Sequence, residues 1–521
     1  MKKNKRFHYF YFFVIVFVLG LMNMYGTGSP TISLLVALFE YGIVIFFLMR
    51  GNYSKSFFYY IAFSATILEF DLYIYGEDAS GHVRYSFDKL PLFKNYLRWL
   101  LAYIYVALAF NEYVAKKYVL SRSMMYLRKW LKILFVSGVI SIIIALIFND
   151  NGVFNNSNVY PEVAILNILQ FLVKASIILT AVFLWGRDGW REQCSYYLQL
   201  ILISVALITV VAAMIGFVGQ YNGRETILLA PLAVALTPML IMFIFKRNET
   251  LLPIVTVLSG VAAIIASIIY GGTAIGSKWY IILFLAVMGL IIMLAKIKSI
   301  WALIVGAVIF LMIVPFIILP VVSLFDANSY AAIKLDQALS TINVFGAENT
   351  VQFFADMNAS PLQRFDELHN ILIEYTHKPW FALFGKGIGG TTRHYTTLLS
   401  WNGLEDFSTD QIRMGAFYRM HESLAVIFLQ HGIIGLLFFF KIIGMLLKRL
   451  YITPWAMMGL IWMFFYWEYG VSLIIGAVIV VLALSEEPSI NEKYSKNKNK
   501  RKSVRSAPYV ETTQGGGIVL Y

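Results

Sequence analysis

His421 and Glu422 stand next to each other where a long apolar run begins, and this pairing could transfer a proton. Histidine takes up and releases a proton near neutral pH, and an adjacent carboxylate can orient the ring or act as the base itself. The position equally suits a residue that caps or anchors the start of a helix. His431 follows ten residues later, about 15 Å along a helix, so we expect it to pack or hydrogen-bond within the bundle instead.

A second group of candidate residues is cationic and suits an anionic ligand. Guanidinium groups donate two parallel hydrogen bonds to phosphate oxygens. Lys278 and Arg224 each precede an apolar run, where a helix N-terminus would add its own attraction for an anion. Each cation alone is better explained as an interfacial anchor or a loop ion pair, so the prediction depends on the whole group. Its other members fall in one polar segment: Arg364, Arg393, Arg413 and Arg419.

Motifs for cofactors and metals are absent from the sequence. Gly385-x-Gly387-x-x-Gly390 formally matches a dinucleotide fingerprint, but it has no βαβ context and is interpreted as a Gly-rich turn. No Walker A motif and no His/Cys spacing for a metal occurs, and the single cysteine, Cys194, excludes an intrachain disulfide. We therefore expect neither a metal nor a cofactor.

The elements that must position these residues are apolar. Of the 521 residues, 59% are hydrophobic and 14% are charged, and the mean hydropathy is +0.72. Soluble domains have about 45–50% apolar and about 25% charged residues, so this composition predicts an integral membrane protein.

Apolar runs of about 20 residues, enough to cross about 30 Å of hydrocarbon, predict the individual spans. We expect them near 7–25, 31–49, 56–75, 92–111, 130–148, 161–185, 196–217, 227–245, 250–270, 279–298, 300–324 and 421–447. The stretch 455–485 is too long for one span and is interpreted as two short segments hinged at Glu468 and Gly470. The predicted fold is an all-α polytopic membrane protein with about 12–14 transmembrane helices and one large structured extracytoplasmic loop.

Charge in the loops predicts the orientation of these spans. Loops 25–30 and 149–161 contain no Lys or Arg, whereas the alternate loops are basic, which places both termini in the cytoplasm. The formal charge of +13 follows this orientation and argues against a nucleic-acid partner. The predicted parts are a transmembrane bundle of about 11 helices, the loop, the last transmembrane helices and a disordered basic cytoplasmic tail: 1–324, 325–420, 421–487 and 488–521.

The segment 325–420 differs from the rest of the chain because it has seven basic and ten acidic residues, a formal charge of −3. Ser360 and Pro361 are typical of a helix start, and apolar residues then recur at helical spacing. We expect an amphipathic helix over 361–376 that lies on the membrane face, with Arg364, Asp366 and Glu367 on its polar side. Pro379 and the stretch FGKGIGG should end it.

Three blocks, in this order, resemble the superfamily of O-antigen ligases and Wzy-type polysaccharide polymerases. The first is Gly-Ser-Lys at 276–278, which begins an apolar run. The second is Arg364, followed by Pro379 and the Gly-x-Gly-x-Gly stretch at 385–389. The third is His-Glu-Ser-Leu at 421–424, which continues to His-Gly-Ile-Ile-Gly at 431–435. The resemblance covers about 270–440, roughly a third of the chain, and agrees with a layout of many spans and one large outer loop.

The resemblance implies transfer of a glycan from an undecaprenyl-diphosphate carrier to a hydroxyl on the outer face of the bacterial cytoplasmic membrane, without a metal. Lys278 stands where the family has its first Arg, Arg364 matches the loop Arg, and His421 matches the His at the helix start. This sequence departs in Lys278, which loses the bidentate fork, and in Glu422 and His431 where Asn and Glu are more typical. The general base therefore stays open between His421 and Glu422.

Our leading hypothesis is a repeat-unit polymerase for capsule, exopolysaccharide or O-antigen, which works beside a flippase and a chain-length regulator of the same pathway. A glycan ligase of the same superfamily is the alternative within this chemistry. A transporter or flippase for lipid-linked sugars is the alternative from another class, but its polar residues should gather near broken helices at mid-membrane. In the leading hypothesis His421 or Glu422 activates the acceptor and Arg364 acts with the cations that bind the diphosphate: Lys278, Arg224, Arg393, Arg413 and Arg419.

Overall fold

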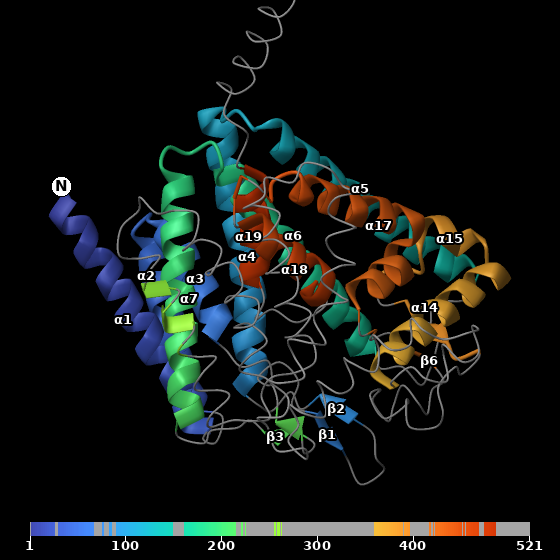
Figure 1. Ribbon diagram of the computed structural model, residues 1–521, viewed down its shortest axis with the longest axis horizontal. Coiled ribbons are helices and arrows are strands. Elements are labelled where there is room, and N and C mark those ends of the chain that lie inside the picture. Colours follow the sequence, from blue (N-terminus) through green and yellow to red (C-terminus); the bar gives the residue numbers. More distant parts are fainter. Residues whose placement is uncertain are drawn as a thin grey trace, which may run out of the picture. The chain divides into compact units, whose positions relative to one another are not determined.

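The computed structural model is mostly helical in the residues that it describes (Figure 1). These residues are 2–26, 30–66, 75–77, 83–85, 90–148, 161–214, 220–221, 224–225, 255–256, 258–260, 262, 359–388, 390–395, 416–417, 420, 422–450, 452–453, 455–467 and 474–485. The predicted spans at 227–245, 279–298 and 300–324, nearly all of 250–270, and the tail 488–521 lie outside them.

The apolar runs of the N-terminal part form long helices. They are α1 (Lys2–Gly26), α2 (Pro30–Met49), α3 (Tyr53–Thr66), α4 (Leu90–Lys116), α5 (Arg122–Ile147), α6 (Pro161–Leu184) and α7 (Trp190–Met214). The Ser121 hydroxyl caps α5 by accepting a hydrogen bond from the backbone N–H of Met124 at 3.3 Å. Helix α4 packs along α6, and α1 packs along α7.

The expected span 56–75 is wrong at its C-terminal end. Helix α3 ends at Thr66, and Tyr75 belongs to strand β1 (Tyr75–Glu77), which pairs antiparallel with β2 (Val83–Tyr85). Aromatic and β-branched residues in the stretch LYIY at 72–75 suit a strand as well as a helix, so hydropathy alone overextended the span.

Aromatic side chains fill the core between the N-terminal helices. Phe58 stacks on Trp190 and on Tyr197, with ring centroids 5.0 and 4.4 Å apart. Phe12 contacts Tyr197 edge-on at 4.7 Å. All four side chains are buried, so α1, α3 and α7 share one aromatic core.

The C-terminal part is built on α17 (Ser423–Leu447), which is interrupted at Gly432. It is followed by α18 (Trp455–Ile461), a π-helical turn η4 (Trp462–Tyr466) and α19 (Ile474–Ser485). The stretch 455–485 therefore forms two separate helical segments, as its sequence predicts, and the expected hinge residues lie outside the described residues. A Cβ on Gly476 would lie 2.0 Å from the Trp462 ring, so α19 crosses the π-turn at close range.

Further described elements lie in the segment that precedes α17. Helices α14 (Ala359–His377) and α15 (Trp380–Phe384) are followed by strand β5 (Thr392–Arg393), which pairs with β6 (Ala416–Phe417). Helix α14 begins two residues before the predicted 361–376, within the usual uncertainty of a helix end.

Within the described part of the chain, α17 is the one helix with both the length and the apolar composition needed to cross a bilayer. Shorter apolar stretches occur at His8–Asn23, Leu34–Met49, Phe171–Leu184, Trp455–Phe464 and Ile474–Ser485.

Candidate functional site

Two of the three predicted catalytic residues meet in the structure. The Nε of Arg364, in the first turns of α14, lies 2.6 Å from Oε1 of Glu422, the residue that precedes α17. The two side chains are 25% and 22% exposed, so each is partly open to its surroundings. Helix α14 and the start of α17 thus meet at two residues that the sequence predicts to be catalytic.

The start of α17 is anchored from the other side as well. The Ser423 hydroxyl accepts a hydrogen bond from the backbone N–H of Trp467 at 3.2 Å. The carbonyl of Trp467 in turn accepts from the buried ammonium of Lys174 on α6. The start of α17, which carries Glu422, is therefore linked by hydrogen bonds to the end of η4 and, through it, to α6.

Helix α14 is oriented differently from the prediction. Asp366 and Glu367, expected on a polar face toward water, are 4% exposed, whereas Phe365 and Leu372 are each 47% exposed. The polar side is buried because it finds partners in the chain that follows: Asp366 lies 3.2 Å from Nε2 of His394. The prediction of an amphipathic helix holds, but its polar side packs inward.

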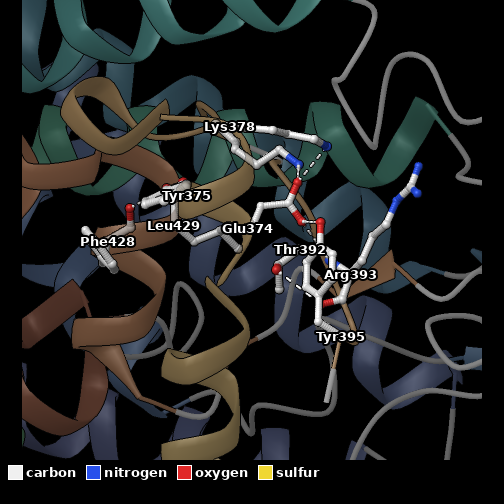
Figure 2. Close-up of polar contacts among 9 residues, drawn as sticks. Glu374, Tyr375, Lys378, Thr392, Arg393, Tyr395, Phe428 and Leu429 are labelled. Atoms are coloured by element: carbon white, nitrogen blue, oxygen red, sulfur yellow. Dashed lines mark hydrogen bonds and ion pairs between the residues drawn. The ribbon is translucent and has the colours of Figure 1, made fainter. Parts of the chain in front are cut away.

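Glu374 is the centre of a buried polar cluster that the sequence analysis missed (Figure 2). Its Oε1 accepts hydrogen bonds from the ammonium groups of Lys378, at 2.8 Å, and Lys386, at 2.9 Å. Its Oε2 accepts from the hydroxyl of Tyr395 at 2.7 Å and from the backbone N–H of Arg393 at 3.3 Å. The spacing of Glu374 and Lys378 by four residues on a helix was the one available signal.

The surroundings of Glu374 favour its charged form. Burial alone would raise the pKa of this carboxyl group, but the ammonium of Lys386 and the hydrogen bonds from Lys378, Tyr395 and Lys386 outweigh it. The pKa of Glu374 is lowered from 4.5 to about 2. The carboxylate is therefore ionised at neutral pH and held by two cations from different segments.

The Gly-rich stretch docks on the interruption of α17. The carbonyls of Leu429 and Gln430 accept hydrogen bonds from the backbone N–H groups of Lys386, at 2.8 Å, and Gly387, at 3.0 Å. The hydroxyl of Tyr375 lies 2.9 Å from the carbonyl oxygens of both Phe428 and Leu429. Carbonyls freed by the interrupted helix are thus satisfied by protein groups, as buried backbone requires.

Close backbone approach explains two glycines of this contact. A Cβ on Gly385 would lie 2.4 Å from the backbone of Gln430, and one on Gly432 would lie 2.6 Å from the carbonyl oxygen of Ala382. Both glycines also have positive φ angles, 76° and 56°. The two glycine motifs of the sequence, which are far apart in the chain, are therefore one structural contact.

His431 packs beside this contact, on the buried side of α17. It is 2% exposed, its ring centroid is 5.4 Å from that of Phe171, and neither ring nitrogen has a hydrogen-bond partner among the described residues. The packing role expected for His431 is confirmed.

The predicted cations are distributed unevenly. Arg224 was expected to open a helix, but it lies in the two-residue strand β4 (Arg224–Glu225), which pairs with β3 (Gln220–Tyr221). The sequence Asn-Gly between these strands is typical of a hairpin turn. Arg393 is exposed in β5, and its side chain extends away from the Glu374 carboxylate (Figure 2). The remaining candidates, Lys278, Arg413, Arg419 and His421, lie outside the described residues.

Among the described residues, no group of three or more His, Cys, Asp or Glu side chains is arranged to hold a metal ion. Comparison with known protein families, with curated proteins and with solved structures gave no match for this chain.

Proposed function

We propose that the chain is a membrane-embedded glycosyltransferase that polymerises lipid-linked oligosaccharide repeat units on the outer face of the bacterial cytoplasmic membrane. The glycan would leave an undecaprenyl-diphosphate carrier and join a hydroxyl of a second lipid-linked repeat. The contact between Arg364 and Glu422 carries the proposal, because it joins a cation suited to phosphate with a carboxylate suited to proton transfer.

Exposed apolar side chains support the membrane part of the proposal. Phe10, Phe39, Ile147, Leu437 and Phe440 are each more than half exposed, although they belong to helices. Large apolar side chains exposed in this number are unfavourable in water and favourable against acyl chains. The topology with cytoplasmic termini and an extracytoplasmic 325–420 segment belongs to this proposal.

The reaction needs two kinds of group at one place. The anomeric C–O bond to the diphosphate breaks, and fixed cations stabilise the charge that develops on the leaving group. The acceptor oxygen forms the new bond to the anomeric carbon, and its proton passes to a base, Glu422 or His421. Arg364 serves this chemistry by contacting the diphosphate and by orienting the Glu422 carboxylate.

The interrupted helix α17 does not favour the transporter alternative. In transporters, the backbone carbonyls of broken helices coordinate ions near the bilayer midplane. Here the carbonyls of Leu429 and Gln430 accept hydrogen bonds from the Gly-rich stretch, so the interruption serves as a docking position within the protein.

A glycan ladder from cells whose own gene is deleted and replaced by variants tests the proposal. Arg364→Ala and His421→Ala should abolish the ladder and leave single lipid-linked repeats on the outer leaflet. Lys116→Ala removes a cation of another surface ion pair and should leave the ladder unchanged. Full-length chains that stay on the carrier would identify a ligase, and repeats confined to the inner leaflet would identify a flippase. An unchanged ladder in Arg364→Ala contradicts the proposal.

A further inference from the structure

Two polar contacts at separate points, in addition to a shared hydrophobic cluster, join helices α14 and α17. One point is the ion pair between Arg364 and Glu422, and the other is the Tyr375 hydroxyl beside the carbonyls of Phe428 and Leu429. Eleven residues separate Arg364 from Tyr375, about 16 Å along α14, and seven separate Glu422 from Leu429, about 10 Å along α17. The helices therefore run in the same direction, and a shift at the second point moves the first.

The second point is also linked to Glu374 through the Gly-rich stretch. The Gly-rich stretch lies between the two helices and binds both: its Lys386 ammonium contacts Glu374 of α14, and its Lys386 backbone N–H contacts Leu429 of α17. Figure 2 shows Glu374 and Tyr375 extending to opposite sides of α14, the first toward Lys378 and Tyr395 and the second toward α17. A single helical turn thus holds the Gly-rich stretch on one side and α17 on the other.

Burial makes this arrangement sensitive to the loss of charge. The Glu374 side chain is fully buried and that of Lys386 is 2% exposed. Removing one partner of a buried ion pair leaves an uncompensated charge in a low-dielectric environment, so the surrounding segments must move to let water reach it. The segment that carries Lys386 is the one that contacts the interruption of α17.

We propose that Glu374 and Lys386 are positioning residues, which fix the register of α14 on α17 so that Arg364 contacts Glu422. Neither residue needs to touch a substrate for this role. This positioning of α14 on α17 does not require any enzymatic activity. Its consequence for glycan transfer rests on the proposed function.

The chain contains a matched control for the Glu374 cluster. Glu112 on α4 also accepts from a Lys four residues later, Lys116 at 2.9 Å, and from a tyrosine hydroxyl, that of Tyr118, and it also has a second cation nearby, Arg187 at 3.8 Å. Glu112 belongs to α4 and takes no part in the α14–α17 contacts. Glu112→Gln therefore removes a similar charge without affecting the register.

The test is a double-mutant cycle on the purified full-length chain, which uses the Arg364→Ala and Glu422→Ala variants and the thermal midpoint as readout. We expect the two substitutions to be non-additive in the wild-type and Glu112→Gln backgrounds, and additive in the Glu374→Gln and Lys386→Met backgrounds. Equal non-additivity in all four backgrounds overturns the proposal. If Glu374→Gln does not yield a monodisperse protein, Glu374→Asp, which keeps the charge on a shorter side chain, replaces it and should weaken the coupling.

A glycan ladder on the same variants separates the two proposals. Glu374→Gln should shorten or abolish the ladder as Arg364→Ala does, whereas Glu112→Gln should keep it. Suppose that the coupling between Arg364→Ala and Glu422→Ala is lost in the Glu374→Gln background, while Arg364→Ala itself leaves the glycan ladder unchanged. This result would refute the polymerase function and leave the positioning role intact. If Glu374→Gln instead retains the coupling but loses the ladder, the positioning role alone would be refuted.

Discussion

The carboxylate of Glu374 binds two ammonium groups, a phenol hydroxyl and a backbone N–H. All these donors favour its charged form. A carboxyl group whose pKa is lower in the folded than in the unfolded chain stabilises the fold only while it is ionised.

The first prediction concerns acid stability. Because folding lowers the pKa of Glu374 from 4.5 to about 2, its contribution is complete above about pH 4.5 and is lost as the pH falls through this range toward 2. The thermal midpoint of the purified chain should therefore fall more steeply between pH 5 and about pH 2.5 than that of Glu374→Gln, which has no such proton to bind. Parallel curves for the two proteins would contradict the lowered pKa.

The second prediction is that replacing His431 by an apolar residue does not destabilise the protein. Its two ring nitrogens are buried without a hydrogen-bond partner in the part of the chain that the structure describes, and an unsatisfied buried polar group costs about 1–3 kcal/mol. His431→Leu should leave the free energy of unfolding unchanged or raise it by about 1 kcal/mol, whereas His431→Gln, which keeps polar atoms, should give no gain. A clear loss in denaturant unfolding of His431→Leu would mean that the ring has a bound partner.

At the scale of elements, the contact between the Gly-rich stretch and α17 depends on backbone packed against backbone. Gly385→Ala should lower the free energy of unfolding by at least about 2 kcal/mol, because the new Cβ meets the backbone of Gln430 and the φ of 76° is strained for alanine. Gly444→Ala is the control: a Cβ there meets nothing within 4 Å, and alanine in a helix interior should gain up to about 1 kcal/mol. Similar midpoints for both variants in urea would show that the docked stretch is not close-packed.

The same elements show what the sequence can and cannot predict. Apolar runs and the Ser-Pro helix start depend on neighbours in the chain, so α1, α2, α4–α7, α14 and α17 were found near their predicted positions. The interruption at Gly432 and the inward polar side of α14 depend on segments distant in sequence, the Gly-rich stretch and the chain at His394. Local patterns show that α14 has two faces, and only tertiary contacts determine which face is buried.

The candidate site, like the fold, could be predicted from the sequence only in part. Residue type and position identify two residues as candidates, Arg364 on the predicted 361–376 helix and Glu422 at the start of a predicted span, and the structure brings them together. Glu374 and Lys386 were missed because a buried ion pair looks like two solvated charges when the fold is unknown. Arg224 lies in a short hairpin directly before an apolar run, and the run alone predicts a helix start there.

At the scale of the whole molecule, the surroundings of α17, water or lipid, determine the free-energy cost of placing a charged side chain on its exposed face. Leu437 lies near the middle of α17 and is 55% exposed, and Ile433 one turn earlier is 45% exposed. On a water-facing helix a substitution there would change stability by about 0.5 kcal/mol or less. Against lipid, an arginine near the helix centre costs about 2.5–3.5 kcal/mol of insertion free energy.

Leu437→Arg should therefore strongly reduce the amount of the chain recovered in the membrane fraction, whereas Val119→Arg should not. Val119 is 87% exposed in the connection between α4 and α5, which the charge pattern predicts to be one of the basic cytoplasmic loops. The measurement is quantitative immunodetection of both variants in membrane and soluble fractions, with expression levels matched. Equal recovery of the two variants would place the exposed face of α17 in water, and the proposed reaction on a membrane-bound carrier would then lose its physical basis.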